Sequence, residues 1–155
     1  MFAKLANSKL HIWHQSGRGR SEQVIDSYKK HKLTTKVTEF IDDMADAYQW
    51  ADVLLCRAGA MTIAECCAAA KPALFVPYPF SAGDHQVKNA QAMVDVGAGV
   101  MVMNEKINQV EMHNALSTLL VSKQKLKEMG AQAHSLHKPN ALQDVADVCL
   151  EYLNA

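Results

Sequence analysis

Thr62 and Glu65 are the residues of this chain whose types and spacing most clearly suggest chemistry. They follow an apolar segment rich in branched residues, 53–56, and a turn that ends in small residues, 57–60. Where a strand turns into a helix, the first N–H groups of the helix lack partners and can bind an anion such as phosphate. Glu65, one turn into the helix, could then accept hydrogen bonds from two adjacent sugar hydroxyls. The pattern predicts a binding site for a phosphorylated ligand.

The same residues allow a second interpretation. Thr-x-x-Glu at a helix start is also the pattern of a capping box, in which the two side chains bind backbone N–H groups of the first turn. Glu65 cannot fully serve both roles, so the pattern leaves the choice open. Arg57 has two interpretations as well, since it could neutralise a phosphate or form a surface ion pair.

Two further segments carry polar groups that could bind a ligand. At residues 40–43 a strand ends, and a backbone leaving a sheet exposes one N–H and one C=O, which match the edge of a pyrimidine base. The alternative is an ordinary loop in which Asp42 or Asp43 caps the helix that follows. Residues 84–89 open a helix on which Gln86 and Asn89 share a face. They could bind sugar hydroxyls or an amide, or form a solvated first turn.

Metal binding is not expected. His11 and His14 fall on opposite faces of a strand, and His134 and His137 have no acidic or cysteine neighbour in sequence. The four cysteines fit neither a zinc site nor a redox pair, so we expect buried free thiols in a reducing compartment. They are Cys56, Cys66, Cys67 and Cys149.

The composition is that of an ordinary globular domain. Of 155 residues, 49% are hydrophobic and 21% charged, and the formal net charge is zero. A neutral chain argues against a broad surface for nucleic acid or anionic lipid. No apolar run approaches the roughly 20 residues of a membrane span, and the first residues lack a signal-peptide pattern.

Short apolar segments alternate with helical ones along the whole chain. We expect strands at 10–14, 36–40, 53–56, 73–76 and 99–103, and helices at 2–6, 21–31, 44–50, 62–70, 85–96 and about 109–153, the last broken near 138–140. This order predicts a single α/β domain, a doubly wound and mostly parallel sheet with helices on both faces. Ligands of such sheets bind beyond the carboxyl ends of the strands, where the candidate residues fall.

Five ordered segments together resemble glycosyltransferase family 28. They are residues 12–17, 37–44, 50–53, 56–62 and 72–77. The resemblance is to the C-terminal domain of the bacterial members that move N-acetylglucosamine from UDP onto lipid I to make lipid II for peptidoglycan. It covers about residues 3–153 and is strong up to about residue 98. It implies the C-terminal, Rossmann-like half of a glycosyltransferase-B fold, an inverting hexosyltransferase activity, UDP-GlcNAc as substrate, and no cofactor.

The resemblance also implies roles for single residues. Ile41 would offer its backbone to uracil, and Glu65 would bind the ribose hydroxyls. The turn at Ala60, Met61 and Thr62 would lie near the diphosphate. Gln86 would contact the sugar, with His85 and Asn89 beside it, while Arg57 remains a candidate without an assigned contact. No catalytic residue is expected in this chain, because the family's proposed base lies in the N-terminal domain.

The chain departs from the family pattern at its start, so we expect a piece truncated at its N-terminus. The family domain begins with a strand and a glycine-rich loop, whereas this chain begins inside the following helix. Without that central strand and the acceptor domain, which would bind lipid I, the piece should be inactive, and a second copy is predicted to cover the gap. The intact enzyme would lie at the cytoplasmic face of the inner membrane. Two alternatives stay open: a non-catalytic subunit that complements a separate acceptor-binding chain, and an unrelated nucleotide-binding domain.

Overall fold

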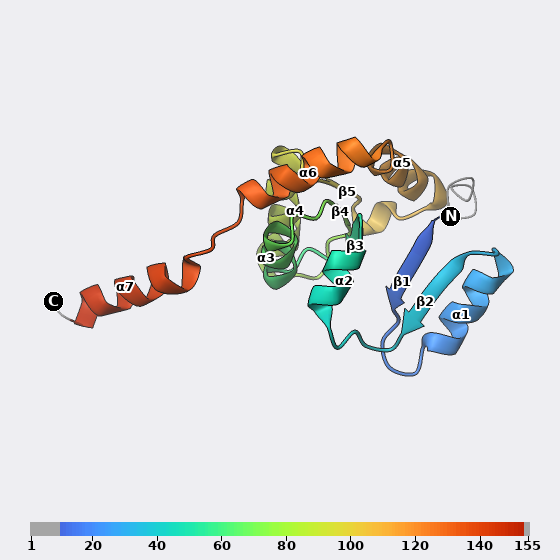
Figure 1. Ribbon diagram of the computed structural model, residues 1–155, viewed down its shortest axis with the longest axis horizontal. Helices are drawn as coiled ribbons and strands as arrows, with labels where there is room; N and C mark the ends of the chain where they lie inside the picture. Colours follow the sequence, from blue (N-terminus) through green and yellow to red (C-terminus); the bar gives the residue numbers. More distant parts are fainter. Residues whose placement is uncertain (1–9, 154–155) are drawn as a thin grey trace.

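The computed structural model describes residues 10–153 of the chain (Figure 1). The elements follow in the order β1 (His11–Gln15), α1 (Ser21–Lys30), β2 (Thr34–Thr38), α2 (Met44–Trp50), β3 (Leu54–Cys56), α3 (Ala60–Ala68), β4 (Ala73–Phe75), η2 (Ala82–Asp84), α4 (His85–Asp95), β5 (Gly99–Met101), η3 (Asn104–Lys106), α5 (Gln109–Leu119), α6 (Lys123–Ser135) and α7 (Ala141–Leu153). The predicted alternation is confirmed. The helix predicted at 2–6 lies outside the described residues.

One strand was placed wrongly. β2 spans Thr34–Thr38, two residues earlier than the predicted 36–40. It pairs in parallel with β1, from His11 opposite Thr34 to Gln15 opposite Thr38. The pairing partner therefore decides where β2 begins and ends, and the apolar pattern of β2 alone could not show this.

The strands form two parallel sheets. One contains β1 and β2, and the other contains β3, β4 and β5 in that order. Figure 1 shows β1, β2 and α1 grouped apart from the three-stranded sheet. The fold is the predicted α/β class with parallel strands, but the single continuous sheet is replaced by two, and one edge of β1 and one edge of β3 have no strand partner within residues 10–153.

The core surrounds β4, whose three residues are all buried. Ala73 and Phe75 pack on one face among residues of α3, α4 and α6, while Leu74 packs on the other face against residues of α5 and α6. Burial on both faces is typical of a central strand in a parallel sheet. This packing holds the turn that precedes α3 in place.

Local caps explain several helix starts. The Asp43 carboxylate accepts from the Asp46 N–H at 2.9 Å and begins α2, and Asn108 caps α5 through the N–H groups of Val110 and Glu111. From the sequence, the first cap was expected at either Asp42 or Asp43, and Asn108 followed three residues later by Glu111 marked the second helix start. Helix α7 follows the predicted break near Pro139, extends away from the other elements and has no buried residue (Figure 1).

Candidate functional site

One cavity in the described structure lies between the two sheets. It measures about 660 Å³ and is lined along its length by β1 and β3. Four of the predicted site residues also line it: Ile41, Arg57, Thr62 and Glu65. The other five do not, namely Ala60, Met61, His85, Gln86 and Asn89. The fold thus brings together residues from segments that are well separated in sequence.

Helix α3 begins without a side-chain cap. Gly59 is the N-cap residue, and no side chain accepts a hydrogen bond there. A capping box would require Thr62 at the cap, but Thr62 is the third residue of the helix, so that interpretation is wrong. The first N–H groups of α3, at Ala60, Met61 and Thr62, are therefore free of side-chain partners and available to an anion.

Glu65 has a different partner from the one a capping box would supply. The hydroxyl of Tyr48 donates to Glu65 Oε2 at 2.7 Å. Tyr48 is the one buried residue of α2, and burial together with this hydrogen bond raises its pKa well above the ordinary value. The phenol therefore stays protonated and keeps donating. It orients the carboxylate and leaves Oε1 for another donor.

The backbone of Ile41 is already in use. Its N–H donates to Gln15 Oε1 at 2.9 Å, across the carboxyl ends of β1 and β2. The side-chain carbonyl of Gln15 occupies the place that a carbonyl of a base would take on this N–H. Gln15 is the last residue of β1, and no sequence pattern indicated this contact.

Gln86 and Asn89 act on the turn before α3. Gln86 Oε1 accepts from the N–H groups of Ala58 at 3.2 Å and Tyr78 at 2.9 Å, and Asn89 Nδ2 donates to Ala58 O at 3.0 Å. Their predicted position on one face of α4 is confirmed, but both amides hold the Ala58 backbone rather than facing solvent. The Gln86 Nε2 group has no hydrogen-bond partner among the described residues.

Arg57 binds carbonyl oxygens. Its Nη1 lies 3.0 Å from Val76 O, 2.9 Å from Pro77 O and 3.1 Å from Asn104 Oδ1. No acidic residue of the described chain pairs with Arg57, so the interpretation that it forms a surface ion pair is wrong. Arg57 thus joins the ends of β3 and β4 to η3. A contact between Arg57 and a phosphate would have to form in addition to these hydrogen bonds.

The remaining predicted residues lie at helix starts. Met61 is in the first turn of α3 with 73% of its surface exposed. His85 opens α4 directly after Gly83 and Asp84, both of which have positive φ angles, and it is exposed. Neither makes a side-chain hydrogen bond among the described residues, so both are free to meet a ligand.

The cysteine prediction is confirmed only in part. Cys66 and Cys67 are buried free thiols, but Cys56 is half-buried and Cys149 is exposed on α7. A hydrogen bond with Cys56 and burial raise the pKa of the Cys66 thiol, and burial raises that of Cys67. These thiols stay protonated and inert.

Two further observations concern the residues that the structure describes. Within residues 10–153 no three histidine, cysteine or acidic side chains gather as a metal site would need. No helix in that range is long and apolar enough to cross a membrane.

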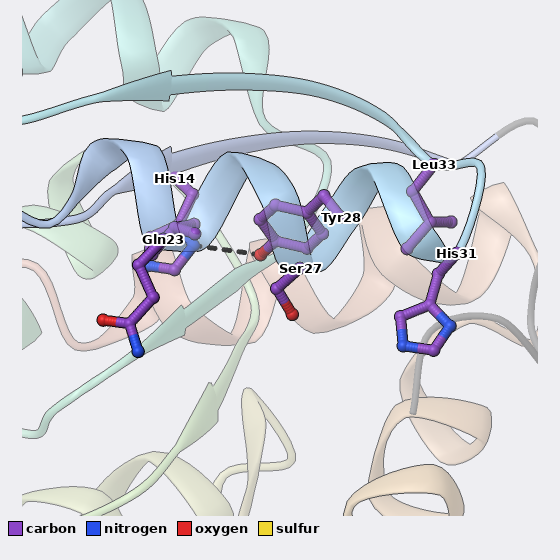
Figure 2. A pocket seen from close by; sticks show the side chains of 7 residues that line it. His14, Gln23, Ser27, Tyr28, His31 and Leu33 are labelled. Atoms are coloured by element: carbon purple, nitrogen blue, oxygen red, sulfur yellow. Dashed lines mark hydrogen bonds between the residues drawn. The ribbon is translucent and has the colours of Figure 1, made fainter.

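A second cavity, of about 410 Å³, lies between β1 and α1 (Figure 2). His14 Nδ1 and the hydroxyl of Tyr28 are 3.0 Å apart there, and burial lowers the pKa of His14. None of the predicted site residues lines this cavity.

Comparison with known proteins supplies the family. Residues 1–147 match the glycosyltransferase family 28 C-terminal domain. The chain is 39% identical over 99% of its length to a Methylococcus capsulatus protein named UDP-N-acetylglucosamine–N-acetylmuramyl-(pentapeptide) pyrophosphoryl-undecaprenol N-acetylglucosamine transferase, of which it covers 43%. A protein of the same name from Pseudomonas paraeruginosa is 42% identical over 90% of the chain, which covers 39% of it.

Solved structures agree. Acinetobacter baumannii MurG superposes with a TM-score of 0.86 and 37% identity, covering 96% of this chain and 44% of that one. The spinosyn forosaminyltransferase SpnP, at 13% identity and a TM-score of 0.57, shares the fold over 83% of this chain and 39% of its own. The chain therefore spans about two fifths of the length of the relatives it matches. It belongs to glycosyltransferase family 28 and corresponds to the C-terminal domain of that family.

Proposed function

We propose that this chain is the UDP-N-acetylglucosamine-binding domain of a hexosyltransferase. The observation that carries the proposal is the cavity that contains Glu65, oriented by Tyr48, beside the uncapped start of α3. A carboxylate with one free oxygen can accept from a ribose diol, and free helical N–H groups can bind a diphosphate. The names of the relatives supply the identity of the sugar and of the nucleotide.

Each part of the donor then has a partner in this chain. The ribose hydroxyls donate to Glu65, and the diphosphate lies at the N–H groups of Ala60, Met61 and Thr62. Uracil binds the backbone of Ile41, which requires the Gln15 side chain to release that N–H. The sugar meets the Nε2 group of Gln86, with His85 and Asn89 beside it. Arg57 supports this site by holding the ends of the strands.

In the longer protein the reaction would be an inverting displacement. The acceptor hydroxyl of lipid I attacks the anomeric carbon, the bond from that carbon to the UDP oxygen breaks, and UDP leaves with the electron pair. The start of α3 stabilises the charge that develops on the diphosphate. A base outside this chain takes the acceptor proton. The chain alone should therefore bind donor without transferring sugar, and no cofactor is required.

The place and partners of the intact protein follow from the same proposal. It would work at the cytoplasmic face of the inner membrane, where its lipid-linked acceptor would be bound by the part that this chain lacks. The predicted pairing of two copies stays a prediction. Light scattering tests it: a dimer that persists on dilution would support it, and a monomer at high concentration would contradict it.

Calorimetric titration of the chain with UDP and UDP-N-acetylglucosamine tests donor binding. Glu65→Ala should weaken UDP binding about 10-fold or more, as expected for loss of hydrogen bonds to a charged group. The variant should distinguish UDP from 2′-deoxy-UDP much less than the unmodified chain does. Glu111→Ala, at an exposed position in the first turn of α5, is the matched control.

Two outcomes would contradict the proposal. One is the absence of binding of either nucleotide at millimolar concentration by a chain with a native melting transition. The other is equal UDP affinity of the Glu65→Ala variant and the unmodified chain.

A further inference from the structure

An exposed aromatic pair lies on the loop that follows the central strand β4. Tyr78 is 46% exposed and Phe80 is 82% exposed. Their ring centroids are 5.6 Å apart and their planes are inclined at 76°, which is an edge-to-face contact. Single exposed apolar side chains are common on protein surfaces, but two aromatic rings in contact form a small apolar surface that a ligand can use.

The backbone of Tyr78 is held on both sides. Its N–H donates to Gln86 Oε1 at 2.9 Å, and its C=O accepts from the Ser81 N–H at 3.3 Å. The same Gln86 oxygen accepts from the Ala58 N–H at 3.2 Å, in the turn before α3. One side-chain amide therefore joins the aromatic loop to the turn that leads into the proposed phosphate site.

The ring of Tyr78 is held as well. The guanidinium carbon of Arg57 lies 5.7 Å from the centroid of that ring, within the range of a cation–π contact. Arg57 Nη1 also accepts no proton of its own but donates to Val76 O and Pro77 O, the carbonyls of the two residues before Tyr78. Because Tyr78 is fixed in this way, its contact with Phe80 orients a ring that is otherwise open to solvent.

The position of the pair matches that of the transferred sugar in the proposed function, on which this inference rests. There the diphosphate lies at the start of α3 and the sugar meets Gln86 Nε2. That nitrogen belongs to the same amide whose oxygen binds the Tyr78 N–H. A sugar held by Nε2 is therefore separated from the aromatic loop by a single amide group.

The chemistry of the pair also suits a sugar ring. A pyranose has an apolar face of C–H groups and a rim of hydroxyls, and the negative face of an aromatic ring attracts such C–H groups. Gln86 Nε2 and the exposed His85 lie beside the loop in sequence and can meet the polar rim. A protein partner would need a wider apolar surface, whereas the loop continues after Phe80 into residues 81–84, which are small or charged.

We propose that Phe80 binds the transferred sugar: its ring stacks on the C–H face of the N-acetylglucosamine ring, and Tyr78 holds Phe80 in that orientation. The pair thereby fixes the plane of the sugar relative to the diphosphate. It contributes to the binding of the sugar and not to the binding of UDP. Arg57 acts on the sugar indirectly, because it supports the ring of Tyr78.

Calorimetric titration of the 155-residue chain with UDP and with UDP-N-acetylglucosamine tests the proposal. Phe80→Ala should weaken binding of UDP-N-acetylglucosamine about 5-fold, the size of one aromatic contact, and leave UDP affinity unchanged. Phe80→Tyr retains the ring and should bind both ligands as the unmodified chain does. Tyr152→Ala is the matched control, because it removes an aromatic side chain that is also 82% exposed, on α7.

Two further measurements separate stacking on the ring from other contacts. Protons on the stacked sugar face should shift upfield in the NMR spectrum when UDP-N-acetylglucosamine binds the unmodified chain, and Phe80→Ala should abolish that shift. UDP-glucose carries the same pyranose ring without the acetamido group. Phe80→Ala should therefore weaken the binding of both nucleotide sugars by the same factor.

Three results would overturn the proposal. The first is equal affinity of Phe80→Ala and the unmodified chain for UDP-N-acetylglucosamine while both bind UDP, which would assign the pair to another partner. The second is an equal loss for UDP and UDP-N-acetylglucosamine, which would show that Phe80 supports the nucleotide or the loop. The third is a loss for UDP-N-acetylglucosamine but not for UDP-glucose, which would make the acetamido group the contact. Absence of UDP binding by the unmodified chain contradicts the proposed function itself, and this inference with it.

Discussion

The three-stranded sheet and the two-stranded sheet bury their residues to very different extents. β4 is buried along its whole length between two apolar clusters supplied by α3, α4, α5 and α6. In the other group, α1 has no buried residue and β1 is half-buried at best. The candidate site spans both groups, because Thr62 and Glu65 belong to the well-packed one while Gln15 and Ile41 belong to the other. We therefore expect a nucleotide-sugar donor to place its phosphate and ribose against the well-packed part of the site and its base against the less well-packed part.

The largest expected effect is a difference between two identical substitutions. Leu74→Ala removes a fully buried side chain from the core around β4 and should lower the free energy of unfolding by about 3 kcal/mol. Leu33→Ala, at a half-buried residue between α1 and β2, should cost about 1 kcal/mol. Urea denaturation measures both. Equal losses would show that the two groups are packed alike.

Tyr48→Phe comes next. It removes the donor to Glu65 and should cost about 1.5 kcal/mol of stability, since a half-buried carboxylate loses a partner. UDP binding should weaken several-fold because the carboxylate is no longer oriented. Phe retains the ring, so the packing of α2 is kept. Unchanged affinity together with reduced stability would show that Tyr48 supports the fold and not the site.

The pH dependence of the same pair gives a second measurement. The pKa of Tyr48 is raised in the folded chain by burial and by the Glu65 hydrogen bond, whereas unfolded tyrosine titrates near 10. Above that pH the unfolded state loses its proton first, so the contribution of Tyr48 is complete below pH ~10 and declines as the pH rises further. The stability difference between the unmodified chain and Tyr48→Phe should therefore stay constant up to about pH 10 and shrink as the pH rises above that value.

Arg57→Ala tests whether this arginine is a structural clamp. Loss of its contacts to Val76 O, Pro77 O and Asn104 Oδ1 should lower the free energy of unfolding by about 1 kcal/mol. The stabilisation gained from adding UDP should be nearly the same in the variant. Arg18→Ala, at an exposed residue, is the control. A variant of normal stability that UDP no longer stabilises would instead make Arg57 a phosphate ligand.

The smallest effect is expected at Gln15, in the less packed group. Gln15→Ala frees the N–H of Ile41, so a base no longer competes with the side chain. UDP affinity should rise about 3-fold, which corresponds to a fraction of one hydrogen bond. Isothermal titration at constant salt measures it. Weaker binding would mean that Gln15 itself touches the nucleotide.

Much of the local structure could be predicted from the sequence alone. Asp43 and Asn108 mark helix starts because a cap acts on N–H groups only two or three residues away. The α/β alternation and the break before α7 follow equally from local patterns. The bounds of β2 could not be predicted, because its pairing with β1 decides which residues extend.

The candidate site shows the same division. The sequence determined which residues follow each strand and that Glu65 lies one turn into α3. The tertiary structure alone decided that Tyr48 holds Glu65, that Gln86 and Asn89 hold Ala58, and that β1 and β3 line the same cavity. The physical reason is distance along the chain. Caps and periodicity act within one or two turns, whereas these hydrogen bonds join segments 17 to 31 residues apart that only packing brings together.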